Sequence, residues 1–356
     1  TQMLNGKKSL LAGAGIVAGL GAGMGAALAG YAYLHEPFAI RLDRLTLHLP
    51  NGQGRLPAGG LRLLHLSDFH FRGAEPREGR KVERVRQAVA GLEYDLLIHT
   101  GDFLHYNAGM ANVLALLEIL PKPRLGAFAV LGNHDYAVYN MSKAVGYTWR
   151  NFVAKESRLA QGDATHRPLT RQERSRRYLR FALHLLHNRI DGEPTGANDV
   201  PRLRYELERK GIQMLHNSSV RLNTGKTDIF LAGVDDIQEG HPDLAAALTG
   251  VDESAPLLLL SHNPDILQAP AAHRADLVLS GHTHGGQIVL PFLGPAHTQS
   301  DLLSRAEVSG HVWMGNTQLY INRGLGEGIP LRFGAPPHLS LLTLLPGEHS
   351  PYFLRR

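Results

Sequence analysis

The chain has 356 residues and contains no cysteine. This absence excludes a disulfide scaffold, a zinc site with cysteine ligands and a catalytic thiol, while it leaves the cellular compartment open. Aromatic residues make up 7% of the chain and charged residues 19%, against 43% hydrophobic residues. The composition predicts a folded protein with a substantial core, and aromatics this sparse give no reason to expect a nucleic-acid partner.

Histidine is abundant, with 20 residues, and the formal net charge is +5 at a sequence pI near 9.4. A packed core has little use for so many imidazoles, because burial disfavours their charged form. We therefore expect the function to depend on histidine.

Charge is absent from residues 9–34, a run of 26 residues that follows Lys7 and Lys8. That length suffices to cross a hydrocarbon core of roughly 30 Å, so the run predicts a single membrane-spanning anchor after a short tail at 1–8. Cleavage of the segment as an export signal is an alternative, since Ala27-Leu28-Ala29 is a small-residue cleavage site. A buried helix in a soluble core is disfavoured by the seven glycines of the run.

Two further features of this segment concern pairing and orientation. Gly15, Gly19 and Gly23 have the small-xxx-small spacing that lets helices approach closely, which suggests a homodimer formed through the helix. The lysines before the span compete with Arg41 and Arg44 after it. The positive-inside rule therefore gives a near tie. A short charged start followed by an apolar run also resembles an export signal, which slightly favours a domain outside.

Beyond the anchor, short runs of Leu, Ile and Val recur, and each ends in polar residues. Such runs with little alternation are typical of strands buried on both faces, and helical stretches lie between them at about 80–92, 112–120 and 201–211. The pattern predicts an α/β fold with its polar clusters at the carboxyl ends of strands, where ligands bind. The clusters are Asp68-Phe69-His70, Gly101-Asp102, Asn133-His134-Asp135, Asp235-Asp236, His262-Asn263 and Gly281-His282-Thr283-His284.

Each cluster by itself is typical of a turn, in which Asp and Asn bond their own backbone. Five of them together supply Asp, Asn and His, which are oxygen and nitrogen donors without sulfur. That donor set predicts a binuclear site for two divalent ions such as Mn, Fe or Zn.

The order of the motifs, D-x-H, GD, GNHD, the lone His of LSHNPD and GHTHGGQ, resembles the calcineurin-like metallophosphoesterase family, in particular its bacterial membrane-anchored branch. The resemblance covers roughly 61–140 and 202–345. It implies a four-layer αββα sandwich of two mixed sheets at 61–345, after a linker and first strand at 35–60 and before a tail at 346–356. It also implies a single-pass protein of the bacterial inner membrane.

The resemblance further implies a ligand set for the two metals. Asp102 would bridge them, and the bridged ions would activate a water for in-line attack on phosphorus. The first metal would be held by Asp68, His70, Asp102 and His284, and the second by Asp102, Asn133, His262 and His282.

By the same resemblance, His134 is the proton donor to the leaving group, with Asp135 as its orienting partner. Gly286, Gln287 and Arg323 are interpreted as contacting substrate or shaping the site, although Arg323 could equally cap a strand end.

The sequence departs from the family pattern at two positions. His105 stands where many relatives carry an acid three residues after the second-motif aspartate, and it is interpreted as a polar loop residue or as an extra ligand. His338 stands where relatives often show an acid.

A basic insertion is expected at about 141–200. Residues 141–190 hold 11 Lys and Arg against 3 Asp and Glu, so this segment accounts for the positive net charge. Residues 171–190 place Tyr178, Ala182, Leu185, Leu186 and Ile190 at helical spacing between arginines, which predicts an amphipathic helix on an anionic membrane surface. A solvated lid helix packed on its own domain is one alternative, and a nucleic-acid-binding helix is another, which the sparse aromatics disfavour.

Three functions follow. The leading one is a membrane-anchored phosphoesterase acting on a lipid-linked phosphodiester or pyrophosphate, with UDP-2,3-diacylglucosamine hydrolysis in lipid A synthesis as the specific candidate. That substrate requires a cytoplasmic site, against the orientation favoured above. The alternatives are an exported phosphodiesterase with a broad range of phosphorylated small molecules, and a non-catalytic scaffold, which a complete ligand set disfavours.

Overall fold

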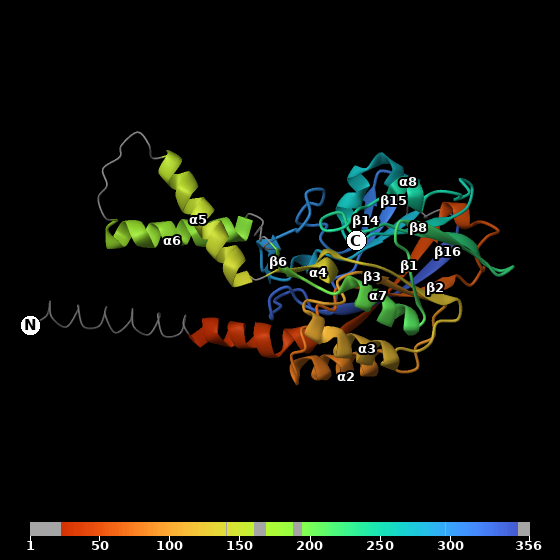
Figure 1. Ribbon diagram of the computed structural model, residues 1–356, viewed down its shortest axis with the longest axis horizontal. Coiled ribbons are helices and arrows are strands. Elements are labelled where there is room, and N and C mark those ends of the chain that lie inside the picture. The colour runs from red at the N-terminus through yellow and green to blue at the C-terminus, as the bar shows by residue number, and fades with distance from the viewer. Residues whose placement is uncertain (1–22, 140, 160–168, 188–193, 296, 348–356) are drawn as a thin grey trace, which may run out of the picture.

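A computed structural model describes residues 23–139, 141–159, 169–187, 194–295 and 297–347, and its centre is a pair of six-stranded mixed sheets (Figure 1). The first sheet has the strand order β1 (Arg41–Leu49), β16 (His338–Pro346), β2 (Leu61–Leu66), β3 (Leu96–Thr100), β4 (Gly126–Val130) and β7 (Ile212–Met214). The second has the order β14 (Gly310–Met314), β15 (Thr317–Ile321), β11 (Leu277–Ser280), β10 (Leu257–Leu260), β9 (Asp228–Gly233) and β8 (Ser218–Asn223). Parallel pairs dominate the middle of both sheets.

Each central strand is apolar on both faces, because its two faces pack against two different core clusters. In β2, Leu64 and Leu66 belong to the cluster under the helices of the first sheet, whereas Leu61 and Leu63 belong to the cluster between the sheets. The strand β10 repeats this alternation, so its uninterrupted leucines fill two cores at once.

Helices cover the outer faces. The helices α2 (Arg77–Val89), α3 (Met110–Ile119) and α7 (Val200–Arg209) supply the outer cluster of the first sheet, close to their predicted positions. The short helix α8 (Leu244–Ala247) and two 3-10 turns supply that of the second. Three core clusters therefore separate four layers in the predicted order αββα.

The first strand belongs to the domain itself. β1 pairs in parallel with β16 from Arg41, opposite His338, to Leu49, opposite Pro346. The domain thus begins at β1, within the segment 35–60 that was expected to be a linker and first strand.

The basic insertion is a helical hairpin. Its helices are α5 (Met141–Leu159) and α6 (Arg171–His187), and the short antiparallel pair β5 (Ala137–Tyr139) and β6 (Pro194–Ala197) closes its base. Trp149 stacks on Tyr178 and meets Phe181 edge-on, which joins the two helices. Figure 1 shows the hairpin extending from the body of the protein.

The predicted apolar face of α6 stays a prediction. Tyr178 is exposed, but Ile190 and the side chains of Ala182, Leu185 and Leu186 lie outside the described residues. Arg177 and Arg180 both pair with Glu156 of α5, so part of the basic character is neutralised within the hairpin.

Residues 23–34 form a helix that ends at a 3-10 turn, Glu36–Phe38. The rest of the predicted span, residues 9–22, lies outside the described residues. Within the described ranges, no helix has both the length and the apolar character needed to cross a membrane.

Candidate metal centre

The predicted ligands converge from five strand ends. Strands β2, β3 and β4 are neighbours in the first sheet, as β10 and β11 are in the second, so their carboxyl ends meet at one edge of the sandwich. The backbone N–H of His282 reaches across this edge to the Asp68 carboxylate, with N–O distances of 3.1 and 3.2 Å. The edge therefore joins residues more than two hundred positions apart in the sequence.

The ligand loops have an unusual backbone. Asp68, His70, Asp102, His282 and His284 all have positive φ angles, between 47° and 69°. Residues other than glycine rarely adopt this left-handed conformation, and where they do, the strain is maintained by the surrounding structure, often at functional sites.

Two glycines allow the loops to approach closely. A Cβ atom at Gly281 would lie 1.9 Å from Ser67 Oγ, and one at Gly132 would lie 2.3 Å from Asp102 Oδ1. Neither position has room for a side chain, so both glycines are required for the carboxylates to lie where they do.

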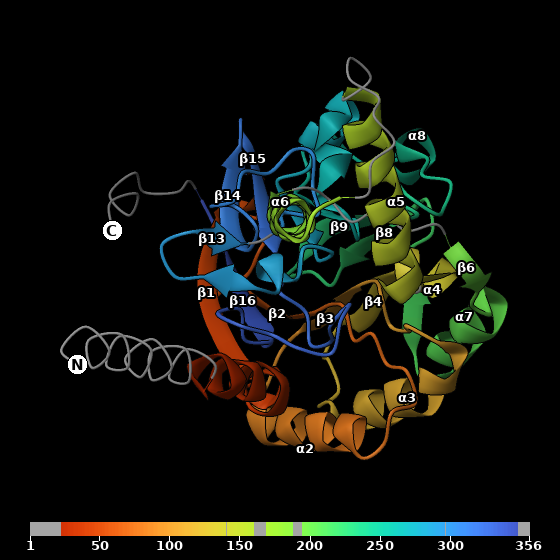
Figure 2. The same ribbon diagram turned by 90° about the vertical axis from the view of Figure 1, so that its left-hand side faces the viewer.

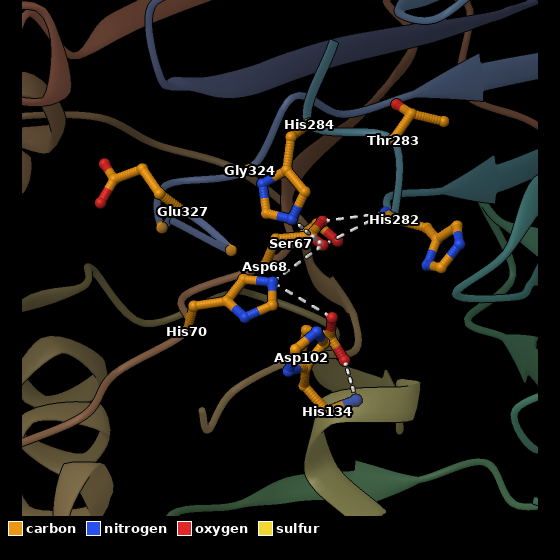
Figure 3. A network of polar contacts seen from close by, with 12 residues as sticks. Ser67, Asp68, His70, Asp102, His134, His282, Thr283, His284, Gly324 and Glu327 are labelled. Carbon is orange, nitrogen blue, oxygen red and sulfur yellow. Dashed lines mark hydrogen bonds and ion pairs between the residues drawn. The ribbon is translucent and has the colours of Figure 1, made fainter. Parts of the chain in front are cut away.

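The first metal group surrounds Asp68 (Figure 3). Its Oδ1 lies 3.7 Å from His70 Nε2 and 3.5 Å from His284 Nε2. The same His70 nitrogen lies 3.2 Å from Asp102 Oδ2. These four residues, predicted to hold one metal, present their ligand atoms to one another in a buried space.

The second metal group continues from Asp102. His262 Nε2 lies 3.2 Å from Asp102 Oδ2, and His282 Nδ1 lies 3.2 Å from His262 Nε2. His262 Nδ1 lies 2.6 Å from the carbonyl oxygen of Thr100, a hydrogen bond that leaves the Nε2 lone pair for a metal. Asn133 Oδ1 is buried and has no hydrogen-bond partner among the described residues.

Electrostatics bind the two groups together. Burial raises the pKa of Asp102, but the positive charges of His262 and His70 lower it by more than burial raises it. The net pKa of Asp102 therefore lies well below its ordinary value. Burial lowers the pKa of His262, and the Asp102 carboxylate reverses the shift and raises that pKa to about 10. Two buried carboxylates among imidazoles and an unpartnered amide oxygen fit a pair of divalent cations, which these residues would hold.

His134 lies next to Asp102 and His70 at this centre. It is the second residue of the short helix α4 (Asn133–Tyr136), and its backbone N–H donates to Asp102 Oδ1 at 2.8 Å. Its ring centroid lies 4.5 Å from that of His70. Burial lowers the pKa of His134 to about 3. The imidazole is therefore neutral at pH 7 before substrate binds.

Asp135 has a different place from the predicted one. Its carboxylate accepts hydrogen bonds from the backbone N–H groups of Asp102, Leu104 and Gly132, at 2.9 to 3.0 Å. It thus orients the loop that carries Asp102 instead of the imidazole of His134.

The three residues predicted to contact substrate or shape the site, Gly286, Gln287 and Arg323, shape the turn after His284. Gly286 and Gln287 continue the left-handed turn after His284, and the Gln287 amide bonds to the backbone of residues 328, 329 and 331. Arg323 lies beneath Gly285 and bonds to Asp43 and His338, so the non-acidic His338 joins β1 to this loop.

His105 contacts the predicted ligand His70. The sequence predicted His105 only as a polar loop residue or an extra ligand. Its Nδ1 is 3.4 Å from His70 Nδ1, on the side of that ring away from the carboxylates. The grouping of His70, His105 and His134 could itself hold a cation.

Sequence reasoning missed two positioning residues. Arg332 is fully buried and donates to the carbonyl oxygens of His284, at 3.3 Å, and Arg323, at 2.7 Å. Asn198 Nδ2 donates to the carbonyl oxygens of His134 and His105. Neither belongs to a predicted motif, and the motif residue that each one contacts is remote in sequence, His284 for Arg332 and His134 for Asn198.

Comparison with known proteins gives the following matches. The sequence model of the family described as calcineurin-like phosphoesterase matches residues 61–286. The UDP-2,3-diacylglucosamine pyrophosphatases LpxG of Chlamydia muridarum and Chlamydia trachomatis are each 32% identical to this chain, over 87% of it and 91% of their own length. An uncharacterized metallophosphoesterase of Bacillus subtilis, YkuE, is 28% identical over 96% of both chains.

Proposed function

This chain belongs to the calcineurin-like phosphoesterase family, as its motifs predicted, and from that premise we propose that it hydrolyses the pyrophosphate bond of UDP-2,3-diacylglucosamine. It is a metal-dependent hydrolase of phosphoric esters or pyrophosphates. The observation that carries the finer proposal is the similarity to the two chlamydial pyrophosphatases, which extends over most of the chain and is not confined to the motifs.

The site supports pyrophosphate hydrolysis in two ways. Asp68, His70, Asp102, Asn133, His262, His282 and His284 would hold the two cations, which supply Lewis acidity that activates water and offsets phosphoryl charge. His134 would give a proton to the departing phosphate oxygen. The anionic substrate favours the protonated imidazole, because a nearby negative charge raises a histidine pKa.

A lipid-linked substrate is consistent with the elements around the site. The helix at residues 23–34 continues the uncharged run, and the arginine-rich α6 extends from the same side of the body (Figure 1). The proposal includes a position of the metal centre at the cytoplasmic face of the membrane, because this UDP-linked lipid requires a cytoplasmic site.

The test compares two substrates. Full-length protein in detergent with Mn²⁺ is given UDP-2,3-diacylglucosamine or bis-p-nitrophenyl phosphate, with Asp102→Asn as the inactive control. We expect release of UMP and the lipid phosphate at a rate well above hydrolysis of the soluble diester, and loss of both reactions in the control. Equal or exclusive turnover of the soluble diester would contradict the proposal and favour an exported phosphodiesterase of broad specificity.

A further inference from the structure

A hairpin with an apolar tip follows the metal-binding turn directly. Its strands are β12 (Val289–Leu290) and β13 (Gly294–Pro295), and the tip is the three-residue turn between them. Phe292 is fully exposed and Leu293 is 68% exposed. Phe292 also has a φ angle of +66°, a conformation that is an outlier for a bulky side chain.

Neither feature serves the fold. A glycine or asparagine would suit the left-handed turn, and a polar residue would suit the exposure. An exposed phenylalanine held in a strained turn is the arrangement of a side chain presented to an apolar partner.

The hairpin is anchored to the metal centre at its base. Gly286 lies two residues after His284, and a Cβ atom there would lie 2.4 Å from Pro295 Cβ of β13. The backbone N–H of Val289 donates to the carbonyl oxygen of Phe333 at 2.7 Å. The tip therefore has a fixed place relative to the ligands.

The same anchoring segment holds the N-terminal helix. The ring of Tyr31 meets that of Phe333 edge-on, with centroids 6.3 Å apart, and the carbonyl oxygen of Ala32 accepts from Arg332 N–H at 2.9 Å. The helix leaves Met24, Leu28, Tyr31 and Leu34 exposed. The segment Arg332-Phe333 therefore contacts both the apolar helix and the base of the hairpin that carries the apolar tip.

We propose that the tip formed by Phe292 and Leu293 inserts into the interfacial region of a lipid bilayer and holds the metal centre against the membrane surface. Three observations identify the bilayer as the occupant. The tip and the helix share a support, the helix continues an uncharged run long enough to span a bilayer, and the arginine-rich α6 extends from the same end. Figure 2 looks onto this end, where β13 is labelled.

The first test measures depth of insertion in full-length protein reconstituted into vesicles of phosphatidylcholine and phosphatidylglycerol, with or without brominated acyl chains. Phe292→Trp introduces a reporter, and Tyr205→Trp on α7, also at an exposed aromatic, is the matched control. Trp149 and Trp313 give the background, measured in the unsubstituted protein. We expect brominated lipid to quench the new fluorophore about twofold at position 292 and hardly at position 205.

Absence of quenching at position 292 would overturn the proposal. A second outcome would also overturn it. If the emission of Phe292→Trp in detergent shifts to the blue as the protein concentration rises, a second copy of the chain covers the tip.

A second test concerns catalysis and, in this respect only, rests on the proposed lipid-linked substrate. The double variant Phe292→Ser, Leu293→Ser should turn over bis-p-nitrophenyl phosphate normally and the vesicle-embedded UDP lipid about tenfold more slowly. An equal loss on both substrates would indicate damage to the site and contradict a membrane role. If the native chain leaves the UDP lipid intact while position 292 is still quenched, the substrate is wrong and the insertion stands.

Discussion

His70 and His105 face each other through their Nδ1 atoms at 3.4 Å, while His70 Nε2 points to the carboxylate of Asp102. The guanidinium of Arg72 also approaches His105 Nδ1 at 3.4 Å. Because arginine only donates hydrogen bonds, His105 Nδ1 is the acceptor, and His70 Nδ1 carries the proton. This tautomer leaves the lone pair of His70 Nε2 free for a metal, so His105 positions the ligand from behind.

His105→Ala should weaken metal binding. Without its acceptor, His70 loses its fixed tautomer and orientation, and such partners typically contribute about 10- to 100-fold in metal affinity. Competition with a chromophoric chelator for Mn²⁺ or Zn²⁺ measures the change, with His216→Ala, a half-exposed histidine, as control. Unaltered affinity in His105→Ala would show that His105 has no positioning role.

His134→Gln should slow the hydrolysis of esters with poor leaving groups most. An alkoxide needs a proton as it departs and a nitrophenolate hardly does, so we expect a loss of roughly 10²- to 10⁴-fold for alkyl esters and a much smaller one for nitrophenyl esters. Steady-state turnover of a matched pair of diesters measures the ratio. Equal losses would contradict the role of proton donor.

Metal affinity should rise with pH. In the metal-free protein Asp102 raises the pKa of His262 to about 10, so His262 carries a proton at neutral pH, and it must lose that proton to bind a cation. Between about pH 6 and pH 8, affinity should increase about tenfold per pH unit for each proton released. Calorimetric titration of Mn²⁺ in buffers of different ionisation enthalpy counts the protons, and a buffer-independent heat would refute the expectation.

Arg332→Leu should destabilise the domain. The substitution removes a buried cation from the carbonyl oxygens of His284, Arg323 and Ala335. Among the described residues, the oxygens of Arg323 and Ala335 then have no donor, whereas that of His284 keeps the backbone N–H of Gln287. The free energy of unfolding should fall by about 3 kcal/mol, as measured by denaturant titration. Arg124→Leu, which removes an exposed guanidinium paired with Asp95, should cost less than about 1 kcal/mol.

The motifs located the site because strand ends are local features. Asp68, Asp102 and His262 each follow an apolar run that can be recognised in the sequence. The parallel order of the strands brings the ends of these runs to one edge of the sandwich. Asp135 was misplaced for a different reason. It is adjacent to His134 in sequence, but its helix turns the carboxylate toward the backbone of the loop carrying Asp102.

The sequence by itself determined the α/β alternation, the donor set, the strand ends that carry it and the basic insertion, because each depends on residue type and on periodicity along the chain. The αββα layers followed from the resemblance of the motifs to a known family. Only the tertiary structure decided which groups support the ligands. His105 acts through a contact with another side chain, and Arg332 and Asn198 act through contacts with backbone oxygens, each between residues far apart in the sequence. Such contacts have no local signature. The strained tip at Phe292 became visible only when the backbone angles and exposure of that one residue were known.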